Sequence, residues 1–128
     1  MKFSPTHPAW WEYAAVMVGG FAGTLSRYGL TELGASQPVV TLLTVNTVGA
    51  FLLGLLLGSL GRPGPRTRAY RLLLGTGFLG GFTTYSAFSL TFAQNLSSLW
   101  LSLAAVALGL GAALVGDQLA RALKRGGR

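Results

Sequence analysis

The chain has 128 residues, of which 51% are hydrophobic and only 10% are charged, and its mean hydropathy is +0.53. Soluble domains carry about 25% charged residues, so this composition excludes an ordinary water-soluble fold and favours an all-α membrane protein. The chain has no cysteine and a single histidine, His7. This content argues against disulfides, thiol chemistry and histidine-based metal clusters.

Long uncharged stretches predict a single domain of four membrane-spanning helices. Residues 33–61 and 72–116 contain no charged side chain, and one span needs about 20 apolar residues. The first stretch therefore holds one span, and the second holds two that are joined by a turn at 94–98. Another span precedes them and carries Glu12 in its first turn and Arg27 near its end. The expected spans are 10–30, 39–60, 72–94 and 97–119, followed by a basic tail at 121–128.

The basic residues predict how the chain is oriented. Four spans place both termini and the polar loop 61–71 on one side, which collects every lysine and arginine except Arg27. An excess of basic residues marks the cytoplasmic side of a membrane protein, so we expect cytoplasmic termini in a plasma membrane. The net charge of +7 then indicates a rim beside anionic lipid and not a nucleic-acid partner.

Small residues at helical spacing predict close packing of the spans. Glycines four residues apart lie on one helix face and let two backbones approach each other in lipid. Such pairs occur in three of the expected spans, at Gly19 and Gly23, Gly54 and Gly58, and Gly77 and Gly81.

The third span has an unusual composition. Its glycines at 75, 77, 80 and 81, followed by Thr83 and Thr84, make a poor helix interior, so we expect a break near residues 80–84. Backbone groups released within a membrane need partners. Two interpretations follow: a kink satisfied by neighbouring hydroxyls, or unwound carbonyls that hold a cation such as sodium.

The polar groups of the spans favour a small anion. Asn46 offers N–H donors, and hydroxyls offer O–H donors at Thr41, Thr44, Thr47, Thr83, Thr84, Ser86 and Ser89. Aromatic rings, whose edges are positive, follow at Phe78, Phe82, Tyr85, Phe88 and Phe92. No carboxylate lies in the middle of a span. An interhelical hydrogen bond is the competing interpretation of Asn46.

Three segments together resemble the CrcB or Fluc family of fluoride channels: GGFAGTLSRY (19–28), TVNTVGAFLLG (44–54) and GFLGGFTTYSAFS (77–89). The resemblance implies an antiparallel dimer of four-span subunits, each with a broken third helix. It also implies two fluoride pores, a central sodium ion, and passive export that lowers cytoplasmic fluoride.

Family pattern assigns roles to individual positions. The backbone carbonyls of Gly80 and Thr83 correspond to the sodium ligands. The fluoride path corresponds to Asn46, Tyr85, Ser86, Phe88 and Arg27.

Some positions depart from the pattern. Tyr85 replaces a usual phenylalanine, Ala87 a usual threonine and Leu42 another threonine, and Ser102 is the candidate hydroxyl of the fourth span. One pore is therefore expected to be altered.

Alternatives to a self-paired fluoride channel remain open. The charge bias favours insertion in one orientation, and hence a heterodimer with a sister subunit over a homodimer that inserts both ways. A small multidrug transporter would need a carboxylate deep in the first span, whereas Glu12 lies in the first turn and suits an interfacial, snorkelling position. A non-conducting partner subunit is a further alternative. No nucleophile, base and orienting group converge, so an enzyme is not expected.

Overall fold

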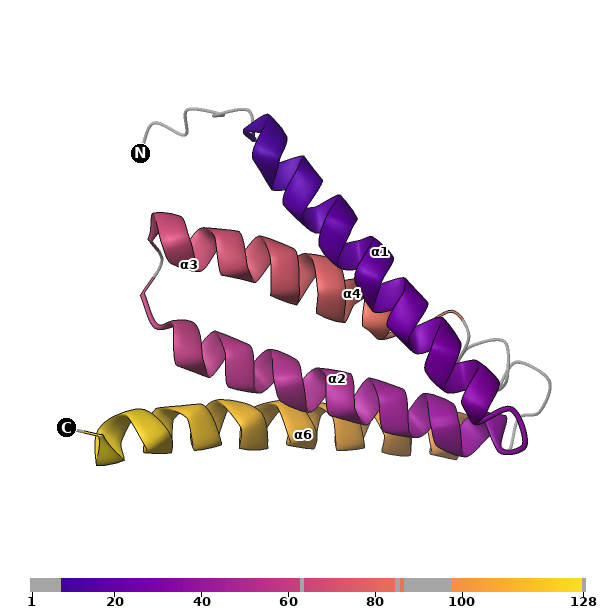
Figure 1. Ribbon diagram of the computed structural model, residues 1–128. Coiled ribbons are helices and arrows are strands. Elements are labelled where there is room, and N and C mark those ends of the chain that lie inside the picture. The colour runs from indigo at the N-terminus through magenta and orange to yellow at the C-terminus, as the bar shows by residue number, and fades with distance from the viewer. Residues whose placement is uncertain (1–7, 63, 85, 87–97, 128) are drawn as a thin grey trace.

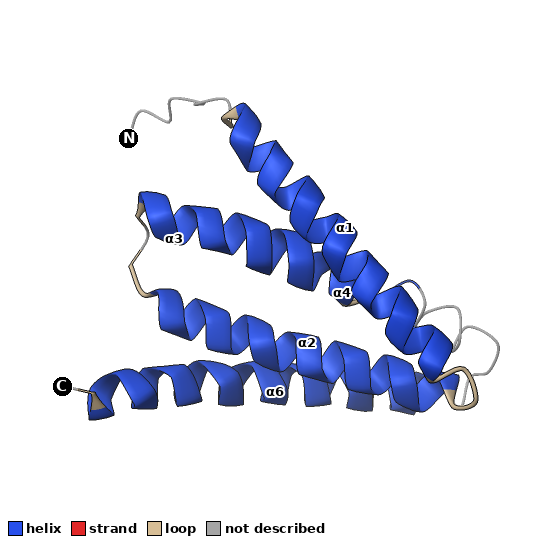
Figure 2. Ribbon diagram, in the orientation of Figure 1, coloured by secondary structure: helices blue, strands red, loops and turns tan. Residues whose placement is uncertain are grey.

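The computed structural model describes residues 8–62, 64–84, 86 and 98–127, and these form a bundle of helices (Figures 1 and 2). Helix α1 spans Trp10–Leu33, α2 spans Pro38–Leu60 and α6 spans Ser98–Gly126. Between them lies a third helical run, which joins α3 (Pro65–Tyr70), the π-helical segment η1 (Arg71–Leu79) and α4 (Gly80–Phe82) without interruption. The expected turn at 94–98 lies outside the described residues except for its last position.

The third helical run begins inside the segment that the sequence indicated as a polar loop. Pro65 occupies its first turn, where the missing N–H of proline costs nothing. The Thr67 hydroxyl oxygen accepts a hydrogen bond from the Gly64 N–H at 2.6 Å, which satisfies the backbone at the helix start. These local signals outweigh the arginine content, so residues 65–71 are helical.

Basic side chains close the C-terminal end of α2. Lys124 Nζ donates to the Gly58 carbonyl at 3.1 Å, and Arg71 Nη2 donates to the Gly61 carbonyl at 3.1 Å. Cations near a helix C-terminus satisfy orphan carbonyls and oppose the helix dipole. The chain then leaves α2 through Gly61, whose φ of 63° favours glycine. The basic tail expected at 121–128 is helical at its beginning, because α6 continues to Gly126.

The helices pack as two pairs, in which α1 crosses the third helical run and α2 lies along α6 (Figure 1). A Cβ added at Gly19 or Gly23 would overlap the backbone of the third helical run. A Cβ added at Gly54 would overlap the Ala113 carbonyl of α6. The glycine pairs of the sequence therefore lie at points of backbone contact, as small residues do in membrane bundles.

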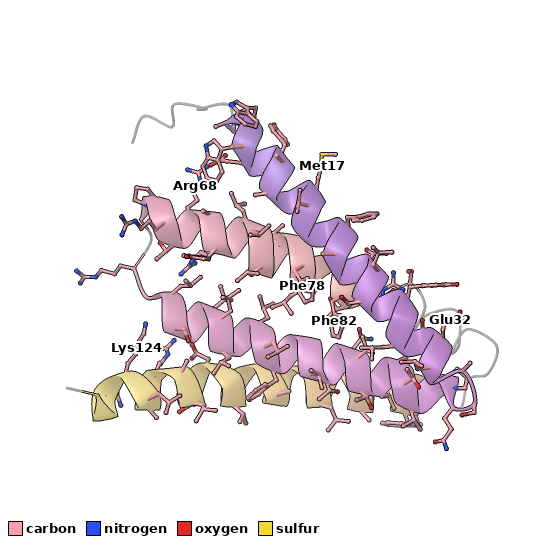
Figure 3. The ribbon with its side chains drawn as sticks, in the orientation of Figure 1. Met17, Glu32, Arg68, Phe78, Phe82 and Lys124 are labelled. Atoms are coloured by element: carbon pink, nitrogen blue, oxygen red, sulfur yellow. The ribbon has the colours of Figure 1, made fainter. Side chains whose placement is uncertain are left out.

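Large apolar side chains cover the outside of the bundle. Met17, which is 73% exposed, points away from α1 (Figure 3), and Phe21 and Trp100 are 69% and 77% exposed. Helix α2 and residues Trp100–Gly126 of α6 are long and apolar enough to cross a bilayer. The junction of α2 with α3 and the C-terminal end of α6 lie at the same end of the bundle (Figure 1).

Candidate functional site

A cavity of about 350 Å³ lies between the two helix pairs. Its apolar wall comes from α2, η1 and α6, and its polar groups come from α2 and the end of the third helical run. The described lining residues are Leu43, Asn46, Thr47, Gly49, Ala50, Leu53, Gly75, Leu79, Gly80, Thr83, Thr84, Ala105 and Val106. The structure thus brings Asn46, Gly80 and Thr83 to one cavity, although they come from distant parts of the sequence.

The third helical run ends within the region where the sequence predicts a break. Its last helical residue is Phe82, and Thr83 is extended, with φ −81° and ψ 151°. Thr83 N–H still donates to the Leu79 carbonyl at 3.0 Å. The chain therefore leaves the helical path at Thr83, beside the cavity; residues 87–97 lie outside the described part.

Asn46 of α2 binds the backbone just beyond this helix end. Its Oδ1 accepts the Thr84 N–H at 2.8 Å, and its Nδ2 donates to the Thr84 carbonyl at 3.0 Å. The interhelical hydrogen bond anticipated as an alternative for Asn46 is therefore present. A carboxamide has two N–H groups, and no acceptor for the second N–H of Asn46, which lines the cavity, appears among the described contacts.

Most hydroxyls do not offer the donors that the sequence indicated. The hydroxyls of Thr41, Thr44 and Thr83 donate to carbonyls four residues earlier, in Gln37, Val40 and Leu79. Threonine commonly forms this bond within a helix, and it engages the O–H hydrogen. Thr47 lines the cavity, and among the described residues its hydroxyl makes no such bond. The donor inventory for an anion is therefore smaller than expected.

The aromatic and hydroxyl residues after the helix are only partly described. Phe78 and Phe82 stack with ring centroids 5.9 Å apart and planes at 11°, between α1 and α2 (Figure 3). Ser86 is exposed, and its Oγ lies 3.3 Å from Thr84 Oγ1. The expected pore residues Tyr85 and Phe88, together with Ala87, lie outside the described residues.

Arg27 lies against the third helical run, outside the described lining of the cavity. Its Nε donates to the Gly81 carbonyl at 3.3 Å. Gly81 belongs to the last turn of that run, where a cation is favourable. The structure thus gives Arg27 a capping contact.

Among the departures from the family pattern, Leu42 is buried in α2. Ser102 lies on α6 and is not among the described lining residues of the cavity.

Comparison of the sequence with known proteins identifies the family of this chain. A model described as CrcB-like protein, Camphor Resistance (CrcB), matches residues 14–117. The chain belongs to the CrcB family. It is 42% identical over 119 residues to a Fluoride-specific ion channel FluC 2 of Leifsonia xyli subsp. xyli, covering 84% of this chain and 82% of that one. It is also 42% identical over 123 residues to a Fluoride-specific ion channel FluC of Alteromonas mediterranea, covering 89% and 94%.

The backbone of this CrcB chain suits a cation beside the cavity. In a continuous α-helix the Thr84 N–H would bond to the Gly80 carbonyl, but here it donates to Asn46. The extended Thr83 turns its carbonyl out of the helical direction. Backbone carbonyls of an unwound helix are suitable sodium ligands, so the expected residues Gly80 and Thr83 fit such an ion. The described residues contain no cluster of His, Cys, Asp or Glu that could hold another metal.

The sequence missed one ion pair of this CrcB chain. Glu12 is buried and forms an ion pair with Arg68, whose Nε lies 2.6 Å from Oε1 and whose Nη2 donates a hydrogen bond to Oε2 at 3.1 Å. Arg68 of α3 thus reaches Glu12 in the first turn of α1, and the interfacial position expected of Glu12 stays a prediction. The only signal was an acidic residue at a helix start opposite a basic segment.

Proposed function

We propose that the chain is a subunit of a fluoride-selective channel through which fluoride leaves the cell passively across the plasma membrane. Membership of the CrcB family and relatives named fluoride-specific ion channels support this function. The structural observation that carries it is a cavity whose polar lining is neutral: the amide of Asn46 and the hydroxyls of Thr47, Thr83 and Thr84, of which the Thr83 O–H is already engaged by the Leu79 carbonyl. Neutral donors can replace part of an anion's water shell and place no carboxylate against it.

The proposed pore residues are Asn46, Tyr85, Ser86 and Phe88, with Arg27 contributing charge near the helix end. Sodium would be held by the backbone carbonyls of Gly80 and Thr83, as a structural cation of the dimer. That ion would supply a fixed positive charge beside the anion path.

The proposed assembly is an antiparallel dimer of multi-pass subunits in contact with lipid. Exposed apolar side chains on α1 and α6 offer surfaces for a second subunit or for acyl chains. Basic residues gathered at one end of the bundle support a cytoplasmic position for both termini. The partner is a sister subunit if the chain inserts one way, and a second copy if it inserts both ways.

A small multidrug transporter receives no support from the site. Its chemistry needs an available carboxylate in the first span, and Glu12 is engaged by an ion pair and a hydrogen bond from Arg68. A non-conducting partner subunit would differ from a channel-forming subunit only in whether fluoride passes through it, and the fluoride efflux assay distinguishes the two.

Fluoride efflux from liposomes that contain this chain alone tests the proposal. A fluoride electrode follows release under an outward gradient, and an identical chloride gradient provides the control. Fast release of fluoride without chloride is expected. If the folded chain releases no fluoride alone but does so together with a sister subunit, the chain belongs to a heterodimeric channel. Silence with every CrcB partner would refute the function.

A further inference from the structure

One backbone N–H at the end of the third helical run has two possible acceptors. In an α-helix the N–H of residue 84 bonds to the carbonyl four residues earlier, which belongs to Gly80. In this structure the Thr84 N–H instead donates to Asn46 Oδ1 at 2.8 Å, although the preceding helical bond, from Thr83 to Leu79, is kept at 3.0 Å. The side chain from α2 therefore replaces the next bond of the helix.

The second atom of the same amide makes this replacement specific. Asn46 Nδ2 donates to the Thr84 carbonyl at 3.0 Å, so donor and acceptor of one side chain bind donor and acceptor of one residue. A hydroxyl carries one hydrogen on one oxygen and cannot bridge both groups at these positions. The paired bonds fix the orientation of the Thr84 peptide groups.

Without this amide the helix has a competing arrangement. An unsatisfied N–H within a membrane costs several kcal/mol, so the Thr84 N–H would turn to the nearest carbonyl able to accept it. Continuation of the helix supplies the Gly80 carbonyl. A carbonyl that accepts this N–H is a poorer and less correctly oriented ligand for a cation.

We propose that Asn46 is a positioning residue for the cation site: by holding the Thr84 N–H, it keeps the Gly80 carbonyl available to sodium. This inference rests on the proposed function, from which it takes the cation. It adds that the residue beside the anion path also sets the geometry of the cation site, so that one side chain couples the two ions. Groups that orient metal ligands commonly change metal affinity 10- to 100-fold when removed.

The test compares cation-dependent stability in three variants of the full chain in detergent. Asn46→Ala removes both bonds. Asn46→Asp keeps an oxygen that accepts the Thr84 N–H but, when ionised, has no donor for the Thr84 carbonyl, so it tests the bond that holds the N–H by itself. Thr44→Val is the control, because Thr44 lies two residues before Asn46 on α2, and among the described residues its hydroxyl bonds to Val40 of its own helix. Thermal unfolding midpoints are measured against sodium chloride, with N-methylglucamine chloride at the same ionic strength as reference.

The wild-type midpoint is expected to rise with sodium, and Thr44→Val and Asn46→Asp are expected to keep that rise. Asn46→Ala should need about 10- to 100-fold more sodium for the same rise. A merely structural role would lower the midpoint equally in both cations and leave the sodium dependence unchanged, which would overturn the inference. So would the absence of any sodium response in the wild type. If Asn46→Ala does not fold, a folded Asn46→Asp without a sodium response contradicts the inference equally.

Fluoride efflux separates this inference from the proposed function. A chain that shows the Asn46-dependent sodium response but conducts no fluoride, either alone or with a CrcB partner subunit, would refute the channel function and leave the positioning role intact. A chain that conducts fluoride but whose sodium response is unchanged in Asn46→Ala would support the channel function and refute the positioning role of Asn46.

Discussion

A methyl group at Gly54 is expected to force α2 and α6 apart. A Cβ at this position would overlap the Ala113 carbonyl oxygen and lie 3.0 Å from the Ala113 Cα. Carbon atoms in contact prefer separations of about 3.5–4.0 Å, so the backbones must separate by about 1 Å or more to clear the Ala113 carbonyl group. The obstacle is backbone, and no side-chain rotation removes it. Overpacking of this kind costs about 1–3 kcal/mol.

Gly111→Ala in α6 is the matched control, because a Cβ there meets no atom within 4 Å. Both substitutions gain about 1 kcal/mol of helix propensity, which cancels in the comparison. Gly54→Ala is therefore expected to be about 1–3 kcal/mol less stable than Gly111→Ala. Detergent-titrated unfolding of the two variants measures the difference. Equal stabilities would refute the close backbone contact between α2 and α6.

Three further predictions concern polar contacts. Arg68→Met should lower the free energy of unfolding by about 1–2 kcal/mol, because it removes the partner of the buried Glu12 carboxylate although the Arg68 side chain is itself largely exposed. The double variant Glu12→Gln/Arg68→Met should recover most of this loss in the same unfolding assay, and additive losses would contradict the pairing. Arg27→Met should cost about 1 kcal/mol through loss of the bond to Gly81, and an unchanged unfolding curve would contradict that bond. Asp117→Asn, which breaks an exposed pair with Arg121, should change stability by less than about 0.5 kcal/mol, and a larger loss would show that the pair is not merely superficial.

The helices were predictable because long apolar stretches favour membrane-spanning helices, of which α2 and α6 are long and apolar enough to cross a bilayer, and because glycine spacing marks the contact faces. The beginning of the third helical run was not. Its arginines suggested a loop, whereas Pro65 and the Gly64–Thr67 hydrogen bond begin a helix there. Local capping geometry determines where the third helical run begins, and the number of charged residues in the segment does not predict it.

Asn46, Gly80 and Thr83, which the sequence indicated as site residues, line one cavity, but the hydrogen bonds at this cavity were not predictable. Glycines followed by two threonines indicated where the helix would end, and it ends at Phe82. The bond between Asn46 and Thr84 depends on how α2 is rotated relative to the third helical run, which no local pattern determines. The hydroxyl donors were overestimated because a threonine in a helix bonds readily to its own backbone.

At the basic end of the bundle, some lysine and arginine side chains make contacts within the fold, and others contribute only their charge. Arg68, Arg71 and Lys124 bind Glu12, Gly61 and Gly58 respectively, so these basic residues are needed for packing whichever way the chain inserts. Other arginines at this end are exposed, and no side-chain bond from them appears among the described contacts; they are Arg62, Arg66 and Arg125.

Replacing these three exposed arginines by glutamine should therefore alter topology without altering stability. Lysine and arginine near span ends set orientation, so the triple variant should shift from one orientation toward a mixture of both, as measured by labelling of terminal tags from each side of the membrane. Its unfolding midpoint should match that of the unmodified chain. Unchanged one-way insertion would show that the arginines engaged in packing are sufficient to orient the chain, and a large loss of stability would show that the exposed arginines also hold the fold.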